Sequence, residues 1–90
     1  MNKEQIQKAR DVDFLELLER MSIEYQNESG HVKVLCPFHN DYKTLSMAIY
    51  PDNKYYCFGC SESGDVISFV MKVYNIEFAD AIQALNEINE

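Results

Sequence analysis

Apolar residues recur at helical spacing near the start of the chain. Between Phe14 and Met21 they fall at separations of three, four and seven residues, which is typical of an amphipathic helix. Asp11 and Asp13 both stand where a carboxylate can cap the first turn. The pattern therefore predicts a helix over about residues 11–21.

The middle of the chain has the shorter, strand-like pattern. Three runs rich in β-branched, aromatic and other apolar residues are Val32–Leu35, Ser46–Tyr50 and Lys54–Phe58. The turn-prone segments between and beside them are Asn27–Gly30, Asn40–Lys43 and Pro51–Asn53. We expect a ribbon of short antiparallel strands over about residues 23–60.

Helical spacing returns in the last third. Ser63-Gly64-Asp65 is a helix start signal, and apolar residues follow at helical separations from Val66 to Val73. Asn75 interrupts the pattern, which resumes from Phe78 to Ile88. The chain is thus predicted to be one α+β domain over residues 1–90, a short antiparallel sheet flanked by an N-terminal helix and by C-terminal helices over about 65–89.

Length and charge narrow the possibilities. Ninety residues with a hydrophobic fraction of 47% suit a small globular domain, and a domain of this size often needs a bound metal for stability. The formal charge is −7, with one basic and six acidic residues in the segment 61–90 and near balance in the segment 22–60. Strong nucleic-acid binding through the last third is therefore disfavoured.

Export and membrane insertion are not indicated. The chain contains no apolar run of the roughly 20 residues that span a bilayer, and its first ten residues lack the hydrophobic core of a signal peptide. Three cysteines are an odd number, which disfavours a closed disulfide framework. These features favour a cytoplasmic protein with no membrane partner.

Two short pairs carry the candidate chemistry. Cys36-Pro-Phe-His39 is a C-x2-H pair and Cys57-Phe-Gly-Cys60 is a C-x2-C pair, each at the end of a predicted strand. A two-residue spacer lets one turn present both ligands to the same ion, and three cysteines with one histidine form a common closed zinc site. We therefore predict one structural Zn²⁺ held by Cys36, His39, Cys57 and Cys60.

Two other interpretations compete with the zinc site. The residues could be buried free thiols beside a surface histidine, or Cys57 and Cys60 could form a redox pair. The sequence Ser-Glu-Ser-Gly that follows Cys60 lacks the strand–helix context of a redox motif. The C-x2-H and C-x2-C pairs use every cysteine of the chain, which favours the zinc site over both alternatives. His31 stands outside both pairs and is expected to be an exposed strand residue.

Aromatic and basic residues lie together on the predicted ribbon. Aromatic side chains beside lysines are the usual platform for single-stranded nucleic acid, although tyrosines and lysines on small sheets often only fill a core or face solvent. Alternation along a strand directs Tyr55 and Tyr56 to opposite faces, so at most one can stack on a base. The candidate contacts are Lys33, Lys43, Lys54, Tyr55 and Tyr56.

At these residues the chain resembles the zinc-binding domain of bacterial DnaG-type DNA primases and of related phage and mobile-element primases. The resemblance runs from about Asp13 to Leu85. The matching segments are Cys36–His39, Lys43–Met47, Pro51-Asp52, Tyr55-Tyr56, Cys57–Cys60, Gly64-Asp65 and Ser68–Met71. Leu45 and Met47 depart from the proline and phenylalanine that are usual in the family.

The resemblance implies a module that recognises single-stranded template DNA. Primer synthesis would belong to a separate primase catalytic domain, and a replicative helicase is a further possible partner. The sequence contains no nucleotide-binding motif and no clustered acidic set for phosphoryl transfer, so no catalytic residue is predicted. The alternative is a zinc-ribbon adaptor whose acidic helices contact a basic protein.

Overall fold

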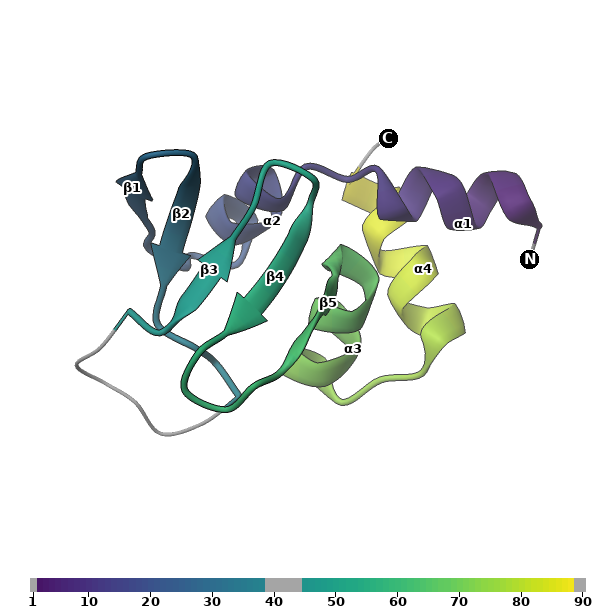
Figure 1. Ribbon diagram of the computed structural model, residues 1–90. Coiled ribbons are helices and arrows are strands. Elements are labelled where there is room, and N and C mark those ends of the chain that lie inside the picture. Colours follow the sequence, from purple (N-terminus) through teal and green to yellow (C-terminus); the bar gives the residue numbers. More distant parts are fainter. Residues whose placement is uncertain (1, 39–44, 89–90) are drawn as a thin grey trace.

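One antiparallel sheet and the helices beside it form the domain in the computed structural model, which describes residues 2–38 and 45–88 (Figure 1). In chain order the elements are α1 (Lys3–Arg10), α2 (Phe14–Arg20), β1 (Gln26–Glu28), β2 (His31–Val34), β3 (Met47–Ile49), β4 (Lys54–Cys57), β5 (Ser63–Asp65), α3 (Val66–Tyr74) and α4 (Phe78–Ile88). The five strands pair in sequence order as a meander. The predicted α+β class with a short antiparallel sheet is confirmed.

The two faces of the sheet have different surroundings. In β4, Lys54 and Tyr56 are exposed while Tyr55 and Cys57 are buried, as the alternation of a strand requires. The inner face packs against α2 and α3, which lie behind the sheet in Figure 1. We call the opposite side the outer face; its residues are His31, Lys33, Ala48, Tyr50, Lys54 and Tyr56.

An aromatic cluster joins the inner face to the helices. The ring of Phe14 in α2 meets Tyr55 at 6.1 Å and Phe69 of α3 at 5.1 Å, both edge to face. Tyr55 and Phe69 lie 5.7 Å apart in a similar geometry. Such pairs add about 0.5–1.5 kcal/mol each beyond burial of their surface. The cluster therefore fixes the position of β4 relative to both helices.

Asn53 fastens the β3–β4 turn to the segment between α1 and α2. Its side-chain amide donates to the carbonyl oxygens of Arg10 and Val12, and its Oδ1 accepts from the backbone N–H of Phe14. The residue has φ +68°, a conformation that asparagine tolerates better than most residues. One side chain thus binds three backbone groups from a distant part of the chain, and the bonds to Val12 and Phe14 are partly buried.

Local signals explain the helix ends. Asp13 caps α2 and Asp65 caps α3, because each carboxylate accepts a backbone N–H from the first turn. Asn75 ends α3 in the left-handed conformation, as its place in the apolar pattern predicted. Asn2 and Gln5 form a reciprocal capping box at the start of α1.

The structure corrects the predicted boundaries in three places. The segment 3–10, for which no element was predicted, is helix α1, and the first predicted helix begins at Phe14 instead of about residue 11. Gln26–Glu28, partly assigned to a turn, is strand β1. Ser63–Asp65, interpreted only as a helix start, is strand β5, so the sheet extends beyond residue 60. None of the helices in the described residues is long and apolar enough to cross a membrane.

Candidate metal centre

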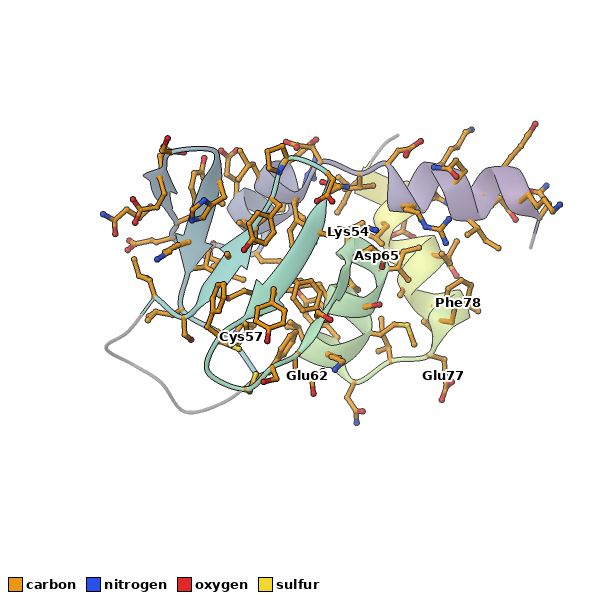
Figure 2. All side chains as sticks on the ribbon, in the orientation of Figure 1. Lys54, Cys57, Glu62, Asp65, Glu77 and Phe78 are labelled. Carbon is orange, nitrogen blue, oxygen red and sulfur yellow. The ribbon has the colours of Figure 1, made fainter. Side chains whose placement is uncertain are left out.

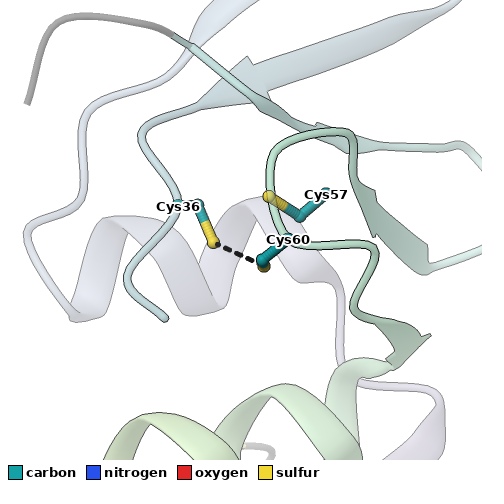
Figure 3. Close-up of side chains that lie close together, drawn as sticks. All are labelled: Cys36, Cys57 and Cys60. Carbon is teal, nitrogen blue, oxygen red and sulfur yellow. Dashed lines mark hydrogen bonds between the residues drawn. The ribbon is translucent and has the colours of Figure 1, made fainter. Parts of the chain in front are cut away.

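Three cysteine side chains meet at one edge of the sheet (Figure 3). Cys36 follows β2, Cys57 is the last residue of β4, and Cys60 lies in the turn between β4 and β5. Their sulfur atoms all lie within 4.8 Å of one another. Cys36 and Cys57 are buried and Cys60 is half-buried, so the cluster sits at the boundary between core and solvent.

The spacing of the sulfur atoms suits a tetrahedral zinc ion. With a Zn–S bond of about 2.3 Å, two sulfur ligands of a tetrahedron lie about 3.8 Å apart. The Sγ atoms of Cys36 and Cys60 are 3.8 Å apart. The cysteines are free thiols and form no disulfide. The described residues therefore supply three soft ligands, of which Cys36 and Cys60 already stand at the separation of two zinc-bound sulfur atoms.

Backbone hydrogen bonds shape the turn that carries Cys57 and Cys60. The N–H of Cys57 donates to the carbonyl oxygen of Glu62 at 2.8 Å, and the N–H of Ser61 donates back to the carbonyl of Cys57 at 2.8 Å. Ser61 adopts φ +62° to complete the turn. These bonds present both sulfur atoms to the same point, as a two-residue spacer requires.

The segment after Cys36 is held from the other side. The N–H of Phe38 donates to Cys36 Sγ at 3.4 Å, and the Phe38 ring packs on Tyr55 at 5.7 Å and on Phe69 at 5.6 Å. The Lys72 ammonium lies 5.7 Å from the centre of the Phe38 ring and pairs with Glu62. Helix α3 therefore contacts the segment after Cys36 through Phe38 and the segment after Cys60 through Glu62.

The thiols differ in how readily they ionise. Burial raises the pKa of Cys36 to about 12, and burial together with the hydrogen bond to Cys57 raises the pKa of Cys60. Burial also opposes ionisation of Cys57, but hydrogen bonds from the Cys60 backbone and the Ser46 hydroxyl outweigh it and lower the Cys57 pKa to about 7. Zinc binds thiolates, so it must displace protons from Cys36 and Cys60, and binding strengthens as the pH rises.

The whole chain is similar to one known protein family. A family model described as the CHC2 zinc finger matches residues 1–90. This chain belongs to the CHC2 zinc-finger family. The resemblance to the zinc-binding domain of DnaG-type primases is thereby confirmed. The family and the cysteine cluster together also confirm the prediction of one structural zinc ion.

Curated relatives of this CHC2 zinc finger are DNA primases. The chain is 36% identical over 87 residues to a DNA primase of Streptomyces coelicolor, covering 94% of the chain and 13% of the relative. It is 37% identical over 81 residues to a DNA primase of Clostridium acetobutylicum, covering 89% of the chain and 13% of the relative. The 90 residues thus span about an eighth of these proteins.

A solved structure has the same fold. The crystal structure of the Aquifex aeolicus primase, comprising its zinc-binding and RNA polymerase domains, matches with a TM-score of 0.82 and 26% identity. The match covers 97% of this chain and 21% of that chain. The CHC2 zinc finger described here is therefore a primase zinc-binding module in fold as well as in sequence.

The other predicted site residues have different surroundings. Tyr55 is 2% exposed and belongs to the core, which removes it from the candidate DNA contacts, whereas Tyr56 is 37% exposed on the outer face. Lys54 is exposed and Lys33 is half-buried on the same face. His39 and Lys43 lie outside the described residues.

Several residues around the cluster were not among the predicted site residues. Phe38, Ser46 and Lys72 contact the cysteine site or its supports. Phe38 stands between Cys36 and His39 in sequence, which was an available signal. Ser46 lies in the segment Lys43–Met47 that matches the family, but its contact with Cys57 depends on strand pairing, and no local pattern marks Lys72.

Proposed function

We propose that this CHC2 zinc finger is the single-stranded-DNA-recognising module of a DNA primase or of a primase-like replication protein. The observation that carries the proposal is the outer face of the sheet, where exposed aromatic rings stand beside lysines. The relatives of this chain that are DNA primases support DNA as the ligand.

Exposed rings form two pairs on or beside the outer face. Tyr56 and Phe58 meet at 4.9 Å and are 37% and 65% exposed. The half-buried ring of His31 in β2 meets Tyr50, which directly follows β3 and is 36% exposed, at 5.6 Å. Aromatic rings that offer a face to solvent stack on bases of any sequence, at about 1–3 kcal/mol per base. Because these rings lie along several strands, from β2 to the end of β4, successive bases of a DNA strand that crosses the sheet could stack on them.

Lysines accompany the rings on the outer face. The strand register places Lys33, Ala48 and Tyr56 side by side across β2, β3 and β4. Lys54 lies two residues before Tyr56 on the same face, next to Asp65 of β5 (Figure 2). Asp65 is itself paired with Arg10 at 3.4 Å, which offsets its negative charge near Lys54. Lys33 and Lys54 are therefore the proposed phosphate contacts, and Lys43 remains a third candidate from the sequence.

We propose Cys36, His39, Cys57 and Cys60 as the zinc ligands. The three thiols of this set lie within 4.8 Å of one another, and the Cys36–Cys60 pair is at 3.8 Å. His39 is the fourth ligand suggested by the C-x2-H pair. A closed set of four protein ligands leaves no position for a reactive water. The ion would order the turns at one edge of the sheet and so hold the outer face in shape.

Primer synthesis belongs to another domain in this proposal. The module would act beside a primase catalytic domain, such as the RNA polymerase domain named for the Aquifex relative, and a replicative helicase is a further proposed partner. A reducing cytoplasm would keep the cysteines available for zinc. Tethering to a catalytic domain raises the effective concentration of DNA, so weak intrinsic affinity would suffice.

Two exposed tyrosines give a matched test of the DNA contact. Fluorescence anisotropy of a labelled single strand is measured with the zinc-loaded chain, with Tyr56→Ala and with Tyr74→Ala. Tyr74 is 56% exposed but lies on α3. We expect Tyr56→Ala to lose about 1–3 kcal/mol of binding free energy, and Tyr74→Ala to bind DNA as the parent chain does.

Salt dependence separates stacking from phosphate contact. Lys33→Ala and Lys54→Ala should each reduce the slope of log affinity against log salt by about 0.7 for a lost single-strand phosphate contact, whereas Tyr56→Ala should leave the slope unchanged. Equal losses for the two tyrosine variants would refute the outer-face contact. Absence of saturable binding even at low salt would remove the DNA function from the isolated module.

A further inference from the structure

An apolar groove lies in the helical layer, away from the outer face of the sheet. It has a volume of about 490 Å³ and is formed by α2, α3 and α4. Its lining residues include Leu17 and Met21 of α2, Val70 and Tyr74 of α3, and Ile88 of α4. Tyr74 is 56% exposed at the groove. The groove is large enough for more than one side chain of leucine size, and none of its residues takes part in the zinc cluster or the outer face.

The groove has one charged residue in its lining, and acidic residues lie beside one of its walls. Arg20 is the basic residue of its lining, and this side chain pairs with Glu16 at 3.5 Å. Beside the other wall, exposed Asp80 and Glu87 are helical neighbours of the lining residue Ala84, at separations of four and three, although both line a separate hollow next to Gln5 of α1. Within residues 2–38 and 45–88, no ion pair joins Asp80 or Glu87 to a basic side chain. Two carboxylates without a basic partner among the described residues therefore lie on α4 next to the wall that Ala84 forms.

We propose that this groove binds a basic amphipathic helix of a partner protein. Leucine-like residues at positions i, i+3, i+4 and i+7 of the partner would enter the floor, which is the usual way a helix occupies an apolar groove. Lysines or arginines beside them would face Asp80 and Glu87. Tyr74 is the anchor, because a large exposed ring beside a pocket contributes more than its neighbours to such contacts.

The same charges argue against other occupants. A second copy of the chain would bring a like-charged α4 edge to the groove, since the formal charge of each copy is −7. A DNA strand would meet Asp80 and Glu87 without a lysine to bind its phosphates. The partner helix and single-stranded DNA would occupy different sides of the module, so both could bind at once.

A designed peptide tests the proposal. The probe is a fluorescein-labelled helix of about 18 residues, or five turns, with leucine at the i, i+3, i+4 and i+7 positions and lysine elsewhere. One control peptide has glutamate in place of each lysine, and another has the same leucines and lysines in scrambled order. Each is titrated by anisotropy with the zinc-loaded 90-residue chain, with Tyr74→Ala and with Tyr56→Ala. Circular dichroism confirms that both variants are folded.

The expected result is saturable one-to-one binding of the ordered leucine–lysine peptide, with both control peptides much weaker. Tyr74→Ala should weaken it about tenfold or more, as loss of an anchor does, while Tyr56→Ala should bind it as the parent does. Equal binding of the ordered and scrambled peptides, or equal affinities of the two variants, would overturn the proposal. Sedimentation showing a dimer that Tyr74→Ala dissociates would assign the groove to a second copy and overturn it as well.

Discussion

At the scale of single residues, Asn53 joins two parts of the chain that the sequence pattern treats separately. Its amide binds the carbonyl oxygens of Arg10 and Val12 and the N–H of Phe14. Phe14 and Val12 are buried. Without Asn53, the N–H of Phe14 and the carbonyl of Val12 would lose their hydrogen bonds and could not bind water instead. The position of α2 behind the sheet therefore depends on a residue in the β3–β4 turn.

Replacing Asn53 with alanine should cost about 1–3 kcal/mol of unfolding free energy, because buried backbone groups lose their partners. Asn75→Ala is the matched control. Asn75 has a similar backbone conformation, with φ 54° against 68°, and ends a helix on the other side of the domain. Urea unfolding of the zinc-loaded chain measures both changes. A loss for Asn53→Ala no greater than for Asn75→Ala would show that the side-chain bonds contribute nothing.

The tyrosine pair shows what a sequence can and cannot specify at this scale. Alternation predicted that Tyr55 and Tyr56 point to opposite faces, and the structure confirms it. The local pattern did not say which of the two is buried. That choice depends on the rings of Phe14, Phe38 and Phe69, which come from distant segments and surround Tyr55.

At the scale of elements, the strongly apolar segments were predictable and the polar ones were not. Helices α3 and α4 and strands β2 to β4 follow the hydrophobic pattern closely. Helix α1 has only Ile6 and Ala9 as apolar residues, and strand β1 has none. Both still carried local signals. These were the capping box of Asn2 and Gln5, and the two-residue Ser29-Gly30 turn that closes the Glu28–His31 pair.

Strand β5 is a different case, because two roles overlap in three residues. Ser63–Asp65 pairs with β4, and Asp65 also caps α3. Gly64 permits the overlap, since a Cβ atom there would lie 2.8 Å from the Cβ of Ser68 in α3. The start signal in the sequence was therefore correct for the helix, but it concealed the strand that precedes it.

Removing zinc with a chelator should loosen the turns at one edge of the sheet before the rest of the domain. Metal binding is coupled to local folding at such sites. Hydrogen exchange followed by mass spectrometry should show faster exchange at the amides of Cys57, Phe58 and Ser61, which hydrogen-bond within or beside the turn. The amides of α4 serve as the internal reference. An unchanged exchange rate at the turn, or an equal increase in α4, would contradict this order.

At the scale of the whole molecule, charge and chemistry are separated between two sides. The sheet side carries exposed rings with Lys33 and Lys54, whereas α4 carries exposed Asp80 and Glu87 beside the apolar groove. The net charge of −7 thus describes neither side alone. The cysteine cluster lies at the edge of the sheet, and Phe38 beside it contacts Phe69 and Lys72 of α3. A metal ion bound by the cysteines would therefore stabilise both the sheet and its contact with α3.

Zinc-edge X-ray absorption of the purified 90-residue chain tests the central claim most directly. The proposed ligands Cys36, His39, Cys57 and Cys60 predict one zinc ion with three sulfur neighbours at about 2.3 Å and one nitrogen neighbour at about 2.0–2.1 Å. His39→Ala should keep the three sulfur neighbours and lose the imidazole signal, with a water oxygen taking the place of the nitrogen ligand. Fewer than three sulfur neighbours, or a parent spectrum that His39→Ala leaves unchanged, would contradict the ligand set on which the ordered ribbon depends.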